Sequence, residues 1–410
     1  MSRLVAQIRL SALYFLVPAL GALSPLIVIP ALTHRYGAAG WAAVAIAQSL
    51  GMAAAVIAEL GWGVIGPQRV ARADAAERMS LYESAFATKL AAVCVLAPVA
   101  ALASFVLATS HKDAAALIGF AMCAGALSPS WFLMGCNKPM AILRVETIPR
   151  LCLTVAAGLA IYLGAPLEIY GVAILTACAV TVVLGARIAD QRLWPQAKAF
   201  REGAQVIRQQ LPITFGRVIS VIYTSLPIAL VSTVSPASVA SFAAIDRLTR
   251  MFLNLLNGVP SRLQSWVGTA PEGQRHHRSR RSLAYNAIFG LGSALFFLIT
   301  APFAARYLFS STVTISFAMA SVSAVIVLVV CASRGYGLSL VAEEGANWIA
   351  VANIGAALVG VCAILGLASA WGAIGGLVGE LLCELTGLGI QVLALHFGRQ
   401  WMARRREGQG

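Results

Sequence analysis

Arginines that interrupt apolar stretches are the residues of this sequence with the clearest capacity for chemistry. One stripe, with spacings of three or four residues, places five positions on a single helix face: Arg247, Arg250, Asn254, Gly258 and Ser261. A shorter stripe of the same kind begins at Arg217 and continues through Ser220 to Thr224. Two such stripes predict a wet, cationic cavity between their helices.

The depth of these arginines makes them candidate ligand-binding residues. Counted from Ala237 at ~1.5 Å per residue, Arg247 lies ~15 Å into its apolar segment, near the middle of a bilayer. Charge at that depth is costly and usually faces a cavity or a partner. Other interpretations stay open, because Asp246 could neutralise Arg250 one turn away and Arg217 could extend to the membrane surface. The predicted substrate-binding residues are Arg217, Arg247, Arg250, Asn254 and Arg262.

Carboxylates in apolar segments form the second candidate set. Glu380 and Glu384 are four residues apart on one helix face, and no basic residue of that helix neutralises them. A buried carboxylate exchanges a proton or takes a cation readily, so one interpretation is coupling to an ion gradient. Hydrogen bonding between helices is the alternative, and Glu59 could equally pair with Arg69 or Arg72. The predicted ion-coupling residues are Glu59, Asp246, Glu380 and Glu384.

Composition identifies the kind of protein that must position these side chains. The 410 residues are 59% hydrophobic and 11% charged, with a mean hydropathy of +0.82. Soluble chains carry about 25% charged residues, so this composition excludes a soluble enzyme and predicts a multi-span membrane protein. The net charge of +14 is better explained by cytoplasmic basic loops than by nucleic-acid binding.

Motifs for catalysis or cofactor binding are missing from the sequence. The eight cysteines fall singly, without the paired spacing of a disulfide framework or zinc site. No HExxH, Walker A or GxSxG motif occurs. The sequence therefore predicts a protein that is not an enzyme and has no metal and no cofactor.

Stretches of about 20 apolar residues predict twelve membrane spans. Their approximate bounds are 10–33, 41–66, 84–108, 114–135, 148–164, 167–187, 211–235, 237–266, 283–305, 313–332, 346–368 and 371–396. With the N-terminus inside, 23 Lys and Arg residues fall in cytoplasmic segments and three fall in outer loops, namely Arg35, Lys112 and Arg306. This asymmetry predicts that both termini are cytoplasmic.

The predicted fold is all-α and polytopic, with two six-helix lobes around a central cavity. The lobes are residues 1–190 and 211–396, with an amphipathic cytoplasmic linker at 191–210 and a basic cytoplasmic tail at 397–410. The halves are weakly similar to each other, and Pro25 and Pro227 occupy nearly equivalent places in spans one and seven. Broken helices at matching positions of two halves are typical of alternating-access transporters.

Four segments carry a resemblance to a known family. They are LTHRYGAAGWAAVAIAQSL, AELGWGVIGPQRVAR, WFLMGCNKPMAILRVETIPRL and PITFGRVISVIYTSLPIALVSTVSPASVASFAAIDRLTRMF. Their order and spacing resemble Wzx-like O-antigen and polysaccharide flippases of the multidrug/oligosaccharidyl-lipid/polysaccharide (MOP) exporter superfamily. One departure is Val64, which stands where the family usually has an aromatic residue.

The resemblance implies a function and a set of partners. Such flippases move an undecaprenyl-pyrophosphate-linked oligosaccharide from the cytoplasmic to the periplasmic leaflet of the bacterial inner membrane, for O-antigen, exopolysaccharide or capsule assembly. Arg217, Arg247 and Arg250 would then meet the pyrophosphate, because a guanidinium binds phosphate oxygens in pairs. A glycan polymerase and other assembly proteins are further partners that the resemblance implies.

Two other functions stay open. One is a multidrug or toxic-compound exporter of the same superfamily, which would need acidic residues facing its first-half cavity. The other is a membrane-embedded glycan polymerase or glycosyltransferase, which would need a large outer loop with catalytic residues. Here the outer loops are short and hold few charges.

Overall fold

The structure is a computed structural model that describes residues 2–190, 195–268, 271, 274–342, 345 and 347–407. Every regular element among these residues is helical, which confirms the predicted all-α fold. Within the same residues, eight segments are long and apolar enough to cross a membrane, as judged by length and composition. The chain is therefore a multi-pass membrane protein.

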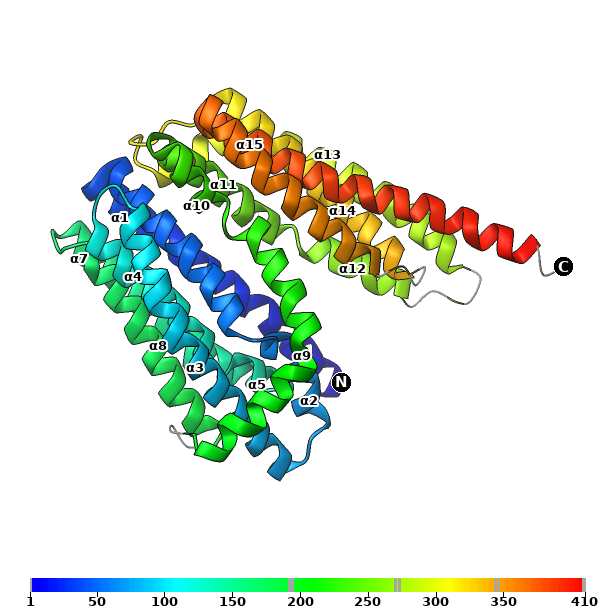
Figure 1. Ribbon diagram of the computed structural model, residues 1–410, viewed down its shortest axis with the longest axis horizontal. Coiled ribbons are helices and arrows are strands. Elements are labelled where there is room, and N and C mark those ends of the chain that lie inside the picture. Colours follow the sequence, from blue (N-terminus) through cyan, green and yellow to red (C-terminus); the bar gives the residue numbers. More distant parts are fainter. Residues whose placement is uncertain are drawn as a thin grey trace. The chain divides into compact units, whose positions relative to one another are not determined.

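The chain forms two compact units. The first unit runs to Val221 and also contains Leu308–Thr312. Its helices (Figure 1) are α1 (Ser2–Ala58), α2 (Trp62–Arg72), α3 (Ala75–Leu107), α4 (Lys112–Ala124), α5 (Ser130–Gly135), α6 (Pro139–Ile142), α7 (Ile148–Tyr162), α8 (Glu168–Ile188) and most of α9 (Ala197–Thr224).

Small residues bring the helices of the first unit close together. Helix α4 packs against α1, α3 and α8 (Figure 1). A Cβ on Gly51 of α1 would lie 2.6 Å from the carbonyl oxygen of Gly119, and a Cβ on Gly119 would lie 2.4 Å from the hydroxyl of Ser104 in α3. Such contacts between small residues are how membrane helices associate when water supplies no hydrophobic driving force.

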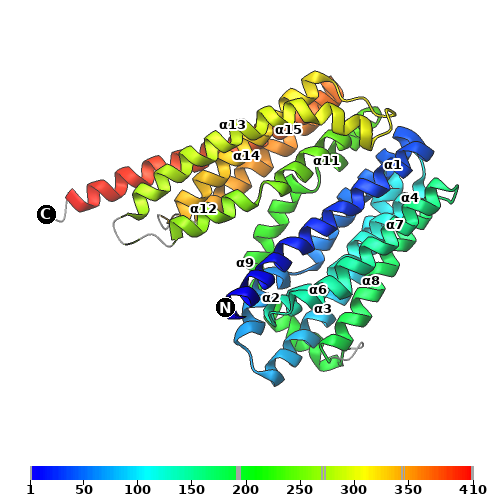
Figure 2. The same cartoon turned by 180° about the vertical axis from the view of Figure 1, so that it is seen from behind.

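The second unit contains Ile222–Tyr307 and the chain from Val313 onward. After the end of α9 its helices are α10 (Pro227–Val234), α11 (Val239–Leu255), α12 (Gly258–Gly268), α13 (Arg275–Leu308), α14 (Phe317–Ala342) and α15 (Asn347–Glu407). Helices α14 and α15 lie side by side, as both views show (Figures 1 and 2).

Helix α15 turns back on itself at Gly372. The backbone there has φ 57° and ψ −132°, which a residue with a side chain rarely adopts. The two arms pack against each other, since Cβ atoms built on Gly360 and Gly379 would lie 2.8 Å from Cys383 and 2.7 Å from Ile364. The arms therefore correspond to the last two predicted spans. Gly37, with φ 62° and ψ −157°, interrupts α1 between the first two predicted spans.

Spans seven and eight are interrupted helices. The chain leaves the helix at Ser225 and Leu226, directly before Pro227, as expected for residues that precede a proline. Helix α1, in contrast, is helical through Pro25, so the two prolines do not break equivalent helices. A turn at Leu256 and Asn257 separates α11 from α12. The polar stripe predicted on one straight helix thus ends at Asn254, and Gly258 begins the next helix.

The predicted linker belongs largely to α9. Residues 191–194 lie outside the described residues, and 197–210 form the first half of this helix. Gly203 lies against α3, where a Cβ would be 2.4 Å from Thr88 and 2.7 Å from the carbonyl oxygen of Ser84. The helix then continues without interruption across the predicted start of the second lobe. The predicted bounds of the lobes, linker and tail stay a prediction.

Candidate functional site

Arg250 joins two helices of the second unit through two carboxylates. Its Nε donates to Asp246 Oδ1 at 2.7 Å, and its Nη2 donates to Glu380 Oε1 at 3.0 Å. The side chains of Asp246 and Glu380 are 7% and 11% exposed, whereas that of Arg250 is 36% exposed. The two contacts use two of the five N–H donors of the guanidinium, and three donors remain.

The sequence explains how Asp246, Arg250 and Glu380, the charged triad of the second unit, come together. Asp246 and Arg250 are four residues apart on α11, so their side chains meet on one helix face. Glu380 arrives from α15 because Gly376, one turn earlier, lets that helix approach closely. A Cβ on Gly376 would lie 2.9 Å from Val231 of α10 and 3.0 Å from Phe242 of α11.

A second arginine extends this charged site. Arg334 of α14 interacts electrostatically with Glu384, which also interacts with Arg250. Nη1 of Arg334 donates to the carbonyl oxygen of Leu253 at 3.5 Å. The site thus combines three carboxylates with two guanidinium groups on α11, α14 and α15. From its sequence position Arg334 is expected in a cytoplasmic segment, with no sign of its contact with the carboxylates.

The other predicted site residues lie apart from the triad or beside it. Arg247 is half-buried on α11, and Asn254 and Arg262 are exposed. Arg217 belongs to α9, but its side chain lies outside the described residues. Glu59 follows the end of α1 in the first unit, where its carboxylate is next to Gly63. The structure therefore brings together Asp246, Arg250, Glu380 and Glu384 from the predicted set.

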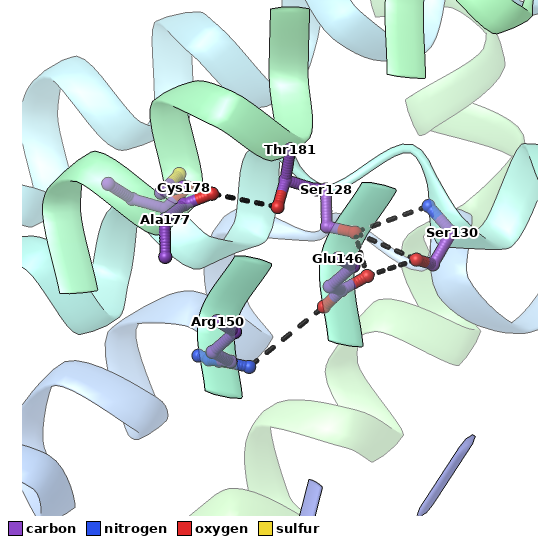
Figure 3. Close-up of polar contacts among 8 residues, drawn as sticks. Ser128, Ser130, Glu146, Arg150, Ala177, Cys178 and Thr181 are labelled. Atoms are coloured by element: carbon purple, nitrogen blue, oxygen red, sulfur yellow. Dashed lines mark hydrogen bonds and ion pairs between the residues drawn. The ribbon is translucent and has the colours of Figure 1, made fainter. Parts of the chain in front are cut away.

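The first unit contains a polar cluster that the sequence analysis missed. Glu146 accepts hydrogen bonds from the hydroxyls of Ser128 (2.8 Å) and Ser130, and Arg150 lies 3.9 Å from its other oxygen (Figure 3). Glu146 occupies a π-helical turn, Leu143–Thr147, that joins α6 to α7. The prediction had begun this span at residue 148. The signal that could have found Glu146 is its spacing of four from Arg150.

Lys89 lies next to this cluster, buried in the middle of the first unit's core. Its side chain is 2% exposed, and its Nζ donates to the carbonyl oxygen of Ser128 at 3.5 Å. Nζ also lies 5.5 Å from the ring centre of Trp131, a cation–π distance. Trp131 in turn packs on Trp62, with 5.5 Å between the rings. The charge asymmetry had counted Lys89 as a cytoplasmic residue.

Comparisons with known proteins agree with this architecture. The sequence matches the polysaccharide biosynthesis protein family over residues 9–262. No curated protein sequence matches it.

Three solved structures show the fold. A multidrug resistance MATE family transporter of the MOP superfamily, in an inward-facing conformation, has a TM-score of 0.62 at 14% identity and covers 96% of both chains. The lipid II flippase MurJ, in an inward closed conformation, has a TM-score of 0.71 at 12% identity, with 95% of this chain and 87% of that one covered. A MOP superfamily transporter from Pyrococcus furiosus has a TM-score of 0.50 at 15% identity, over 97% and 95%.

These similarities confirm the resemblance to MOP superfamily transporters and the helical membrane fold. At such identities they show the fold alone. The family match, however, covers more than half of the chain. The protein therefore belongs to the polysaccharide biosynthesis protein family.

Proposed function

We propose that this protein flips an undecaprenyl-pyrophosphate-linked oligosaccharide from the cytoplasmic to the periplasmic leaflet of a bacterial inner membrane. Both termini lie in the cytoplasm, and the product serves O-antigen, exopolysaccharide or capsule assembly. Membership of the polysaccharide biosynthesis protein family supports the glycan. The similarity to the fold of a lipid II flippase supports movement of a lipid-linked molecule.

The observation that carries this proposal is the arrangement of Arg250. Asp246 and Glu380 hold the guanidinium from one side, so it is oriented before any ligand arrives. The three N–H donors that these contacts leave can serve phosphate oxygens, which a guanidinium binds in pairs. Arg247 lies three residues earlier on α11, about one helical turn away, and adds a second positive charge. A pyrophosphate is the ligand that best matches two neighbouring arginines.

The carboxylates of the same site supply a means of ion coupling. A proton or a cation on Glu380 would weaken its hold on Arg250, because the attraction between opposite charges would be lost. Glu384 lies one turn further along α15 and interacts with both Arg250 and Arg334. An ion gradient could then change how firmly the arginines hold their ligand. This step connects ion binding with substrate release during alternating access.

Surface polysaccharide in a deletion strain tests the proposal. Deletion should remove the surface glycan and leave undecaprenyl-linked oligosaccharide on the cytoplasmic side, and the wild-type gene should restore export. Arg247→Ala should fail to restore it while the protein is still inserted, and Arg247→Lys should restore little if paired phosphate contacts are required. The control is Arg306→Ala, which changes an exposed arginine at the end of α13. Normal surface glycan with Arg247→Ala would exclude the proposed role of Arg247.

Ion coupling has its own test. The double substitution Glu380→Gln with Glu384→Gln should slow export, and the wild-type rate should depend on an imposed proton or sodium gradient. An export rate that is the same in both proteins under every gradient would make the two carboxylates structural. Protein level and thermal unfolding of the double variant separate lost coupling from lost folding.

A multidrug exporter is the second candidate function. The observation that favours it is the similarity to the fold of a multidrug resistance transporter. It predicts that deletion raises drug sensitivity and leaves the surface glycan intact. The same deletion strain therefore distinguishes the two functions.

A further inference from the structure

One face of α12 carries an open pocket that lies apart from the Arg250 site and contains Arg262, which the sequence had predicted as a substrate-binding residue. The pocket has a volume of about 520 Å³ and is lined by Gly258, Val259, Arg262, Leu263 and Trp266. Gly258, Arg262 and Trp266 are four positions apart, as are Val259 and Leu263, so the five residues form a single face of the helix. Apart from Arg262, which is exposed, the side chains that line the pocket are apolar or aromatic.

A second arginine contacts Trp266, one of the residues that line this pocket. Nη1 of Arg278, from the start of α13, donates to the carbonyl oxygen of Trp266 at 3.0 Å. Its guanidinium lies 5.3 Å from the ring centre of Trp266, and the ring of Tyr285 lies 6.1 Å from the same ring. Arg278 is thus oriented by Trp266 while keeping further donors available.

The surroundings of the pocket are positively charged. His277, Arg280 and Arg281 are exposed on the same end of α13. Neither α12 nor α13 contains an acidic residue. An anion that approached Arg262 and Arg278 would therefore meet only attractive formal charges from these two helices.

We propose that this pocket binds the phosphate headgroup of an anionic phospholipid. Arg262 and Arg278 contact the phosphate, Val259 and Leu263 contact an acyl chain, and the rings of Trp266 and Tyr285 lie at the level of the headgroups. Tryptophan and tyrosine are typical of that level of a bilayer. Basic pockets at the ends of membrane helices are where anionic lipid headgroups bind.

This lipid goes beyond the proposed transport function, because it is a lasting ligand of the second unit and not the cargo. Neither Arg250 nor its carboxylates line the pocket. The proposal can therefore fail while the flippase proposal stands, and the reverse holds as well.

Native mass spectrometry of the purified, delipidated full chain tests the proposal. The probes are phosphatidylglycerol and phosphatidylcholine, which share their acyl chains and differ in net charge. Phosphatidylglycerol should bind in preference. Arg262→Gln should weaken its binding about fivefold, which is the effect of ~1 kcal/mol per basic residue at a membrane surface.

Two further variants keep the result interpretable. Arg280→Gln is the matched control, because position 280 lies about 200° around the helix from Arg278 and faces away from the pocket. It should change binding less than twofold. Gly258→Leu should block binding without unfolding the protein, because a Cβ at that position meets nothing within 4 Å.

Several results would overturn the proposal. One is equal binding of phosphatidylcholine and phosphatidylglycerol, which would mean a non-specific lipid contact. Another is an equal loss with Arg280→Gln and Arg262→Gln, which would mean general surface charge. A third is binding of undecaprenyl pyrophosphate in the absence of phosphatidylglycerol binding, which would assign the pocket to the cargo.

Discussion

Arg250 has to satisfy two requirements that oppose each other. Its two carboxylate partners must be neutralised because they are almost fully buried, and under the proposed function its own donors must remain available to a ligand. A guanidinium can do both, since its five N–H donors point in different directions within one plane. A lysine has the charge but lacks this geometry. The residue type is therefore as informative as its position.

Removing the guanidinium should destabilise the protein. In Arg250→Gln, Asp246 and Glu380 lose two charge-assisted hydrogen bonds and face each other without a counter-charge. We expect a loss of roughly 1–3 kcal/mol in the free energy of unfolding, less than for a fully buried pair because Arg250 is partly exposed. Thermal unfolding of the purified protein in detergent measures it.

The control for this prediction neutralises all three partners. Asp246→Asn, Arg250→Gln and Glu380→Gln together should recover most of the lost stability, because no uncompensated charge remains. Export should stay low, because the cation is still missing. A triple variant as unstable as Arg250→Gln would show that shape, and not charge, stabilises this contact.

The sequence was informative at this scale where an ionisable residue interrupted an apolar stretch. This signal selected four residues that the structure brings together, namely Asp246, Arg250, Glu380 and Glu384. A spacing of four residues also predicted that Asp246 lies next to Arg250, and that Glu380 lies next to Glu384. The contact between Arg250 and Glu380 could not be predicted, because it depends on the approach of α15 at Gly376. Glu146 and Lys89 were missed since they lie near the ends of predicted spans, where charge is ordinary in a sequence. In the fold Lys89 is buried and Glu146 is partly buried.

At the scale of elements, glycines decide where the long helices turn. Gly37 and Gly372 adopt similar positive-φ conformations, so a side chain introduced at either position would strain the backbone. Their surroundings differ. A Cβ on Gly37 meets nothing within 4 Å, whereas a Cβ on Gly372 would lie 2.5 Å from the hydroxyl of Ser238.

This difference predicts unequal effects of the same substitution. Gly37→Ala should cost about 1–3 kcal/mol of stability through backbone strain alone. Gly372→Ala should cost about 1 kcal/mol more, because Ser238 must turn away and lose its hydrogen bond from Ser235 (2.9 Å). Thermal unfolding of both variants measures the difference.

A double-mutant cycle isolates the role of Ser238. In a Ser238→Ala background the clash and the hydrogen bond are both gone, so Gly372→Ala should then cost about as much as Gly37→Ala. If Gly372→Ala still cost about 1 kcal/mol more than Gly37→Ala in that background, the additional strain would lie in the backbone of α15 itself.

The positions of the helices were predictable from hydropathy. The points at which a helix is interrupted were only partly predictable. Twenty-residue apolar windows located the paired arms within α15, and Pro227 marked the break that follows α9. The turn at Leu256 and Asn257 carries no proline or glycine of its own, so a single span was predicted there. At Pro25 the sequence predicted a broken helix, but α1 continues through this proline. Membrane helices tolerate proline when neighbouring groups satisfy the freed carbonyl.

For the whole molecule, charge asymmetry determines the expected orientation. Arginines and lysines concentrate on alternate connections, which predicts cytoplasmic termini and an even number of crossings. Eight segments satisfy the length and composition of a span among the described residues, and one of them, Asn347–Phe397, contains the turn at Gly372. The predicted orientation of the C-terminus therefore depends on whether each arm of α15 crosses the membrane separately.

Labelling of introduced cysteines in intact spheroplasts tests this topology. Two crossings of α15 place Trp371, which is 62% exposed, on the periplasmic side with Lys112, and place Arg280 on the cytoplasmic side. A membrane-impermeant maleimide should therefore label Trp371→Cys and Lys112→Cys directly, and Arg280→Cys only after permeabilisation. The protein without an added cysteine gives the background, because Cys94, Cys152 and Cys362 are exposed within the apolar segments. Labelling of Trp371→Cys only after permeabilisation would mean that α15 does not form two crossings in the predicted orientation.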